Sequence, residues 1–129
     1  MKALQRILHV EDEADIREIV VLALEMIGGF TVESCSSGQE ALEKAPNFAP
    51  DIILMDIMMP GMDGPETYRQ LQQIPDIVGI PVIFMTAKVQ SHEVDEYIKL
   101  GGVGVISKPF DPTSLSKEIV EIWESLNDK

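Results

Sequence analysis

Four stretches of this sequence, each mainly apolar, run directly into residues that can take part in phosphate chemistry. The stretches and the residues that follow them are, in chain order, residues 7–10 with Glu11 and Asp12, residues 52–55 with Asp56, residues 82–85 with Thr86, and residues 105–107 with Lys108. Together they supply three carboxylates, a hydroxyl group and an amine. Such a set can hold a divalent metal ion and accept a phosphoryl group, provided that the fold brings its members together.

Each stretch is short, rich in large apolar residues and bounded by turn signals, which is typical of a strand buried on both faces in a parallel sheet. In open parallel sheets, ligands bind beyond the carboxyl ends of the strands. If the four strands pair in parallel, the residues that follow them converge on one edge of the sheet. That edge is the predicted site.

The three acids have the composition of a magnesium site. A carboxylate directly after buried apolar residues, as Asp56 is, costs free energy unless it is paired. Glu11, Asp12 and Asp56 in one place would repel one another and raise their pKa values, and a hard divalent cation removes that repulsion. Mg²⁺ would also neutralise charge on an incoming phosphoryl group. We therefore expect Mg²⁺ here, with Asp56 as the nucleophile that forms an aspartyl phosphate.

Lys108 and Thr86 complete the predicted chemistry. A lysine or a threonine at a strand end is ordinarily a surface or structural residue, and only the coincidence of four such strand ends favours a role in a site. The Lys108 ammonium group could pair with Asp56 and then with the phosphate, and the Thr86 hydroxyl group could donate to a phosphoryl oxygen. Ala87 is small and leaves room for that group.

Helical patterns alternate with the strands and place the chain in the α/β class. The first, roughly residues 14–27, carries an apolar stripe and is ended by Gly28-Gly29. Four more helices are expected: from Ser37 to near Pro46, from Pro65 onward, at residues 91–100, and after a cap at Asp111-Pro112. An outer strand is expected at residues 30–34. This alternation, with right-handed crossovers, gives a doubly wound parallel sheet covered on both faces.

Length and composition fit a single domain over residues 1–129. The net charge of −12 argues against direct nucleic-acid binding, because a phosphate backbone needs a basic surface. No apolar run is long enough to cross a bilayer, and the N-terminus lacks the apolar stretch of a signal peptide. The single cysteine, Cys35, excludes an internal disulfide and suits a reducing compartment, so we expect a cytoplasmic protein.

Taken together, the motifs resemble the signature of response-regulator receiver domains of two-component signalling. They are Glu11-Asp12, the stretch 51–64 that contains Asp56 and ends in Met62-Asp63-Gly64, Thr86-Ala87, and Lys108-Pro109-Phe110. The resemblance covers essentially the whole chain. It implies a flavodoxin-like fold, with a five-stranded parallel sheet in the order 2-1-3-4-5 and five helices.

The resemblance also implies a phosphoacceptor, a set of metal ligands and two residues that bind the phosphoryl group. Asp56 would be the phosphoacceptor. Mg²⁺ would be held by Glu11, Asp12 and Asp56 with the backbone carbonyl group of Met58. The phosphoryl group would be bound by Thr86 and Lys108. The peptide bond between Lys108 and Pro109 is expected to be cis.

Partners follow from the same resemblance. The phosphoryl group would come from a sensor histidine kinase or a histidine phosphotransfer protein, since His9 lies within a strand and His92 is expected in solvent. The donor would be recognised by the exposed face of the first helix, with residues such as Asp15, Arg17, Glu18 and Val21. The phosphorylated domain would then pass its phosphoryl group onward in a relay or bind a downstream target protein.

One position departs from the family pattern. Many receivers carry Tyr or Phe three residues before the lysine, and its ring turns inward when the threonine moves to the phosphate; here that residue is Val105. Without a ring, we expect the switch to depend on Thr86, the loop after it and the fourth helix. Tyr97, in that helix, is interpreted as a core residue.

Three other functions share part of this pattern. A haloacid-dehalogenase-type phosphatase needs a second Asp two residues after the nucleophile, where this chain has Met58. A flavodoxin-type flavin binder needs a hydroxyl-rich or glycine-rich loop after the first strand, whereas residues 11–15 are mostly acidic. The third is an inactive receiver used only as a docking module, and the complete chemical set argues against it.

Overall fold

The computed structural model describes residues 3–87 and 90–127 and contains one parallel sheet. Its five strands lie in the predicted order, β2-β1-β3-β4-β5. In chain order they are β1 (Arg6–Val10), β2 (Thr31–Cys35), β3 (Ile52–Asp56), β4 (Val82–Thr86) and β5 (Gly104–Ser107). The outer strand β2 lies one residue later than predicted. The order places the carboxyl ends of β1, β3, β4 and β5 next to one another, as the four motifs require.

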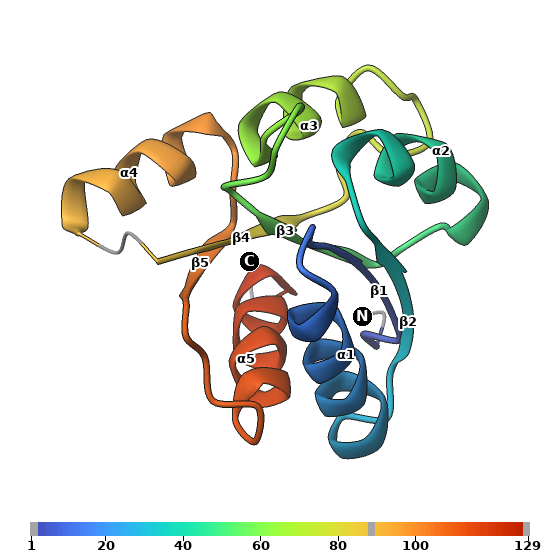
Figure 1. The fold of residues 1–129 in the computed structure, drawn as a ribbon, viewed down its shortest axis with the longest axis vertical. Coiled ribbons are helices and arrows are strands. Elements are labelled where there is room, and N and C mark those ends of the chain that lie inside the picture. The colour runs from blue at the N-terminus through green and yellow to red at the C-terminus, as the bar shows by residue number, and fades with distance from the viewer. Residues whose placement is uncertain (1–2, 88–89, 128–129) are drawn as a thin grey trace.

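Helices cover both faces of the sheet (Figure 1). The helical segments are α1 (Ala14–Leu22), its π-helical continuation η1 (Ala23–Ile27), α2 (Gly38–Phe48), α3 (Gly64–Leu71), α4 (Ser91–Leu100) and α5 (Leu115–Asn127). Helices α1 and α5 lie side by side on one face, and α2, α3 and α4 cover the other. None of the described helices is long and apolar enough to cross a membrane.

Two apolar cores, one on each face, hold the layers together. Successive side chains of a strand point to opposite faces, so neighbours in the sequence enter different cores. Leu8 and Ile53 pack with Phe84 beneath α2, α3 and α4, whereas Ile7 and Leu54 pack beneath α1 and α5. Every residue of β3 and β4 is buried. Burial of each large aliphatic side chain contributes about 1.5–3 kcal/mol, so the ends of these strands are firmly held.

The amino end of the sheet has its own anchor. Oδ2 of Asp51 accepts hydrogen bonds from the backbone N–H groups of Gln5 at 3.0 Å and Arg6 at 2.9 Å. The Arg6 guanidinium group donates to the carbonyl oxygen of Phe48 and lies 4.2 Å from the centroid of its ring. These contacts join the starts of β1 and β3, and so fix how far each strand reaches at the other end of the sheet.

The first helix differs from the sequence expectation over its last turn. It widens into a π turn, in which the Gly28 N–H group donates to the Ala23 carbonyl oxygen at 3.2 Å. The same oxygen accepts a hydrogen bond from Ser116 Oγ of α5 at 3.4 Å, so the wider turn presents a backbone acceptor to the neighbouring helix. A π turn is one residue longer than an α turn and ends here at the predicted glycines, so the apolar pattern does not reveal it.

Two other helix ends differ as well. The second helix, expected to end near Pro46, continues to Phe48, because proline removes one helical hydrogen bond and the rest remain. The prediction that Asp111 caps the fifth helix is wrong, because that helix begins at Leu115. Asp111 instead closes a separate turn, in which its Oδ1 accepts hydrogen bonds from the Thr113 N–H group at 2.9 Å and hydroxyl group at 2.7 Å.

Candidate metal and phosphoryl site

Backbone hydrogen bonds continue the sheet one residue past three strand ends. The donor and acceptor pairs are Glu11 N and Cys35 O at 3.0 Å, Ile57 N and Met85 O at 3.0 Å, and Lys108 N and Thr86 O at 2.9 Å. The predicted site residues on β1, β3 and β5 are therefore positioned by the sheet rather than by a flexible loop. Thr86 is the last residue of β4, between β3 and β5.

The three predicted acids come together at this edge. One carboxylate oxygen from each of Glu11, Asp12 and Asp56 lies within 4.8 Å of the others. Glu11 and Asp56 are 0% and 2% exposed, and Asp12 is half-buried. Carboxylate oxygens are the ligands that hard divalent cations prefer, and Mg²⁺ is commonly held by one or two of them with water molecules. The donor set therefore fits Mg²⁺.

Lys108 lies between two of these acids. Its Nζ donates to Asp56 Oδ1 at 3.0 Å and to Glu11 Oε1 at 3.0 Å. Its side chain is 18% exposed, so the two ion pairs are largely shielded from water. The peptide bond between Lys108 and Pro109 is cis, as expected.

Burial dominates the electrostatics of the two inner acids. It raises the pKa of Asp56 and of Glu11, and the Lys108 ammonium group opposes that rise in both. For Lys108, burial would lower the pKa, but the hydrogen bonds to Asp56 and Glu11 outweigh it, and the pKa is raised overall. The amine thus stays charged, and it favours the ionised form of the acid that is predicted to act as nucleophile.

The structure places Arg17 differently from the position that the sequence predicts. The helical pattern predicts it on the exposed face of the first helix, but it is half-buried, and its Nη1 donates to the backbone carbonyl oxygens of Glu11 at 2.8 Å and Asp12 at 3.0 Å. The Glu13 N–H group donates to Glu11 Oε2 at 3.2 Å. The acidic loop is therefore tied from both sides. The position of Arg17, one turn into α1, allows its side chain to reach these carbonyl oxygens, but does not by itself predict the contact.

The loop after Asp56 is closed by a tight contact. The Gly64 N–H group donates to the Ile57 carbonyl oxygen at 2.9 Å. A Cβ atom on Gly64 would collide with the Asp56 carbonyl oxygen and lie 2.9 Å from Ile57 Cα, so only glycine fits without moving the loop. Met58 lies within this loop with its side chain 65% exposed.

Thr86 has a neighbour that the sequence did not predict. It is 1% exposed, and its hydroxyl group lies close enough to Tyr97 of α4 to oppose the rise that burial causes in the pKa of Tyr97. The Tyr97 ring lies 5.8 Å from the Phe84 ring, centroid to centroid. Tyr97 is thus part of the core, as predicted, and also reaches the site. Val105 is half-buried beside Phe84 on β5.

Neither histidine is arranged as a phosphoryl donor to this site. His9 is fully buried in β1, and its two ring nitrogens have no hydrogen-bond partner among the described residues. Burial, with the nearby Lys108 and Arg17 cations, lowers its pKa to about 3, so the ring is neutral. His92 is exposed on α4.

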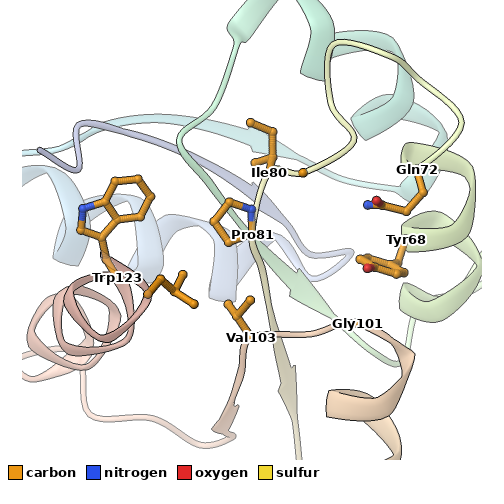
Figure 2. Close-up of a pocket in the computed structure, with 9 residues that line it drawn as sticks. Tyr68, Gln72, Ile80, Pro81, Gly101, Val103 and Trp123 are labelled. Atoms are coloured by element: carbon orange, nitrogen blue, oxygen red, sulfur yellow. The ribbon is translucent and has the colours of Figure 1, made fainter. Parts of the chain in front are cut away.

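A separate cavity of about 410 Å³ lies at the opposite, amino end of β4 and β5 (Figure 2). Trp123 of α5 and Tyr68 of α3 lie on either side of Pro81 and Val103, which directly precede the two strands. Its lining is aromatic, aliphatic and amide in character. It is therefore distinct in place and chemistry from the acidic site.

Comparison with known proteins agrees with this fold. The structure of the chemotaxis protein CheY4 of Vibrio cholerae superposes with a TM-score of 0.85 at 30% identity, over 93% of this chain and 99% of that one. Residues 7–120 match the family described as the response regulator receiver domain. The chain therefore belongs to the receiver-domain family of two-component response regulators, as its motifs predicted.

Curated relatives place it among regulators of this family. It is 36% identical over 123 residues to the probable transcriptional regulator ycf27 of Guillardia theta, covering 95% of this chain and 47% of that protein. It is 39% identical over 109 residues to the phosphate regulon transcriptional regulatory protein PhoB of Pseudomonas aeruginosa, covering 84% and 47%. The chain thus spans about half the length of these relatives.

Proposed function

We propose that this chain takes a phosphoryl group from a histidine kinase or a histidine phosphotransfer protein onto Asp56, with Mg²⁺. The observation that carries the proposal is the Lys108 ammonium group, 3.0 Å from Asp56 Oδ1 and 3.0 Å from Glu11 Oε1. It favours the ionised carboxylate that a nucleophile needs, and it lies where the charge of a phosphoryl group would arrive. The proposed unit is a single receiver domain of residues 1–129.

In the proposed reaction, a carboxylate oxygen of Asp56 attacks the phosphorus atom of a phosphohistidine. The new bond joins oxygen to phosphorus, the phosphorus–nitrogen bond breaks, and the imidazole leaves with that electron pair and takes up a proton. Asp56 is 2% exposed, so the acceptor is shielded from water. Lys108 would shift its contact to a phosphoryl oxygen, and Thr86 would donate a hydrogen bond to another.

Glu11, Asp12 and Asp56, with the backbone carbonyl group of Met58, would hold the metal ion. When bound, Mg²⁺ supplies positive charge that offsets the carboxylates and the phosphoryl oxygens. The clustering of the three carboxylates within 4.8 Å supports this assignment. Arg17 supports it as well, because its two hydrogen bonds fix the backbone that carries Glu11 and Asp12.

Two outputs are compatible with this reaction. The phosphorylated domain would either pass its phosphoryl group onward in a relay or bind a target protein after a change of conformation. Direct nucleic-acid binding by this domain is not part of the proposal, because its net charge of −12 repels a phosphate backbone.

Labelling with a small acyl phosphate in the presence of Mg²⁺ tests the proposal. We expect one phosphate-sized mass increase that maps to Asp56 and is absent from Asp56→Asn. Asp76→Asn makes the same chemical change at an exposed carboxylate in the segment before β4, and should label like the wild type. A wild type that gains no phosphate, or an Asp56→Asn variant that gains it at the wild-type rate, would overturn the assignment.

A further inference from the structure

The cavity at the amino ends of β4 and β5 is lined by parts of the chain that lie far apart in the sequence. Tyr68 and Gln72 come from the end of α3, and Trp123 comes from α5. Gly101, which ends α4, lines it as well. Figure 2 shows the Tyr68 and Trp123 rings at opposite sides of the cavity. Its volume of about 410 Å³ lies within the range of pockets that hold small molecules.

The lining of the cavity indicates the chemical class of a ligand. None of the described residues that line it is charged, so a charged ligand would leave water without gaining a partner. An anion would also be repelled by the net charge of −12. Aromatic and aliphatic side chains form most of the surface, which favours a flat apolar ring. The lining therefore fits a neutral aromatic molecule.

Two polar groups on the Tyr68 side would fix the orientation of such a ring. In Figure 2, the Gln72 amide and the Tyr68 hydroxyl group both point toward the middle of the cavity. Neither group has a hydrogen-bond partner among the residues that the structure describes. A side-chain amide offers both donors and an acceptor. A ligand with a neutral amide on its ring can therefore pair with Gln72 while the ring lies toward Trp123.

The cavity also borders the end of α4. Gly101 has a φ of 137°, which favours glycine, and a Cβ atom there would collide with the Tyr68 hydroxyl oxygen. No described side chain of α4 is fully buried, and those that pack against the apolar core, Tyr97 and Leu100, lie in its last turn. A helix with few buried contacts moves at low free-energy cost. A ligand that adds contacts at this end would restrain the helix.

We propose that this cavity is a regulatory site for a small neutral aromatic molecule, which restrains α4 in its unphosphorylated position. The ligand lies between Tyr68 and Trp123 and contacts the backbone at Gly101. It loses that contact when α4 moves, so its affinity differs between the two states, and a ligand shifts an equilibrium through such a difference. The regulatory role rests on the proposed function and on the expected part of α4 in the switch.

Titration with benzamide tests the site, because this molecule has one flat ring and one neutral amide. In the wild type, millimolar benzamide should shift the NMR signals of the Gly79, Gly101 and Val103 amides and of the Trp123 indole N–H group, and the shifts should saturate. Benzoate has nearly the same shape but a negative charge, and should shift these signals far less. The absence of saturable shifts with benzamide at these positions would overturn the inference.

Two glutamine variants test the orientation of the ligand. Gln72→Ala removes the amide that points into the cavity, and should weaken benzamide binding roughly two- to tenfold. Gln73→Ala makes the same change at the next residue, which is exposed and does not line the cavity. Its affinity for benzamide should match that of the wild type. Equal affinities in the two variants would overturn the proposed binding mode.

Beryllofluoride, a mimic of the phosphoryl group, tests the regulatory role. With Mg²⁺ present, saturating benzamide should weaken beryllofluoride binding by about two- to fivefold, and beryllofluoride should weaken benzamide binding by the same factor, because coupling between two sites is reciprocal. The amide shifts that a fixed concentration of the mimic causes in residues 94–100 should shrink. Equal beryllofluoride affinity with and without benzamide would overturn the regulatory role and leave the proposed function intact. A wild type that binds benzamide but no beryllofluoride would overturn both.

Discussion

Two halves of the site are held in different ways. The charged half consists of Glu11, Asp12, Asp56 and Lys108, and the hydroxyl half consists of Thr86 and Tyr97. The charged half is fixed by backbone bonds that extend the sheet and by ion pairs of 3.0 Å from Lys108 to two buried acids. In the hydroxyl half, Thr86 is fixed on β4, but Tyr97 comes from a helix that has no fully buried side chain among those described.

The difference matches two physical requirements. Chemistry needs groups that are already in place, because rearranging them during the reaction would raise the barrier. A signal needs an element with two arrangements of similar free energy, which a ligand can bias through its different affinity for each. The charged half meets the first requirement and the hydroxyl half meets the second. The following predictions test whether the two halves are separable in this way.

Removal of the amine should have the largest effect. Lys108→Met keeps the length of the side chain but leaves Asp56 and Glu11 buried without their cation, which favours their protonated, unreactive forms. We expect the rate of acyl-phosphate labelling to fall on the order of 100-fold. Mass spectrometry measures the rate, and circular dichroism checks that the variant is folded. Labelling close to the wild-type rate would mean that the charged half works without Lys108.

Changes to the metal ligands should come next. Asp12→Asn should raise the Mg²⁺ concentration needed for half-maximal labelling by about tenfold or more. Glu11→Gln should raise it less, because the Glu11 carboxylate already accepts hydrogen bonds from Lys108 and from the Glu13 N–H group. Labelling rates over a Mg²⁺ titration measure both. Equal shifts in the two variants would contradict this ranking.

Thr86→Ala should separate the halves most cleanly. The charged half stays intact, so Asp56 should still be labelled, but the beryllofluoride mimic should bind about fivefold more weakly for want of one hydrogen bond. The NMR shifts that the mimic causes in α4 should disappear. An α4 response that persists in Thr86→Ala would mean that the signal leaves the site by another route.

Arg17→Gln should have a smaller effect on the rate of phosphorylation, and the effect should be the same for either phosphoryl donor. Because Arg17 holds the backbone of Glu11 and Asp12, its loss should slow acyl-phosphate labelling and transfer from a kinase alike, by about two- to fivefold. The exposed residue Glu18, replaced by Gln, is the matched control and should leave acyl-phosphate labelling unchanged. If Arg17→Gln slowed only the transfer from a kinase, Arg17 would be a recognition residue, as the family resemblance predicts.

The smallest effect should be on stability as a function of pH. Burial raises the pKa of Asp56 in the folded domain, so between its unfolded and folded pKa values the folded state binds more protons than the unfolded state. The contribution of this group to the unfolding free energy therefore falls as the pH rises through that window. Asp56→Asn lacks the group, and should gain stability relative to the wild type from about pH 4 upward. Urea unfolding without Mg²⁺ measures this; a relative stability that falls with pH would reverse the sign.

The positions of the charged half are predictable from the sequence for a simple reason. A strand buried on both faces ends where charged residues begin, so β3 ends at Asp56, and β1 ends just before Glu11. Parallel pairing then brings these ends to one edge. The chemistry of the charged half follows from residue types at strand ends, and the family resemblance adds a role for each.

Contacts made by long side chains are not predictable in the same way. Helical periodicity places Arg17 on the polar side of α1, but whether it extends into solvent or bends back to two carbonyl oxygens depends on the shape of the loop. Periodicity also places Tyr97 over the core. Its closeness to Thr86 depends on how α4 lies across β4, which is a tertiary relationship. The sequence therefore predicts the charged half better than the hydroxyl half.

The close packing around Gly64 limits how this sequence can change in evolution. Its backbone does not adopt the left-handed conformation that favours glycine; the constraint is space, because a single added carbon would meet the Asp56 carbonyl oxygen. A mutation there displaces the chain at the phosphoacceptor itself, so drift at this position cannot be neutral for the chemistry. A descendant that has lost this glycine should also have changed its loop between Ile57 and Gly64, and the two changes should be inherited together.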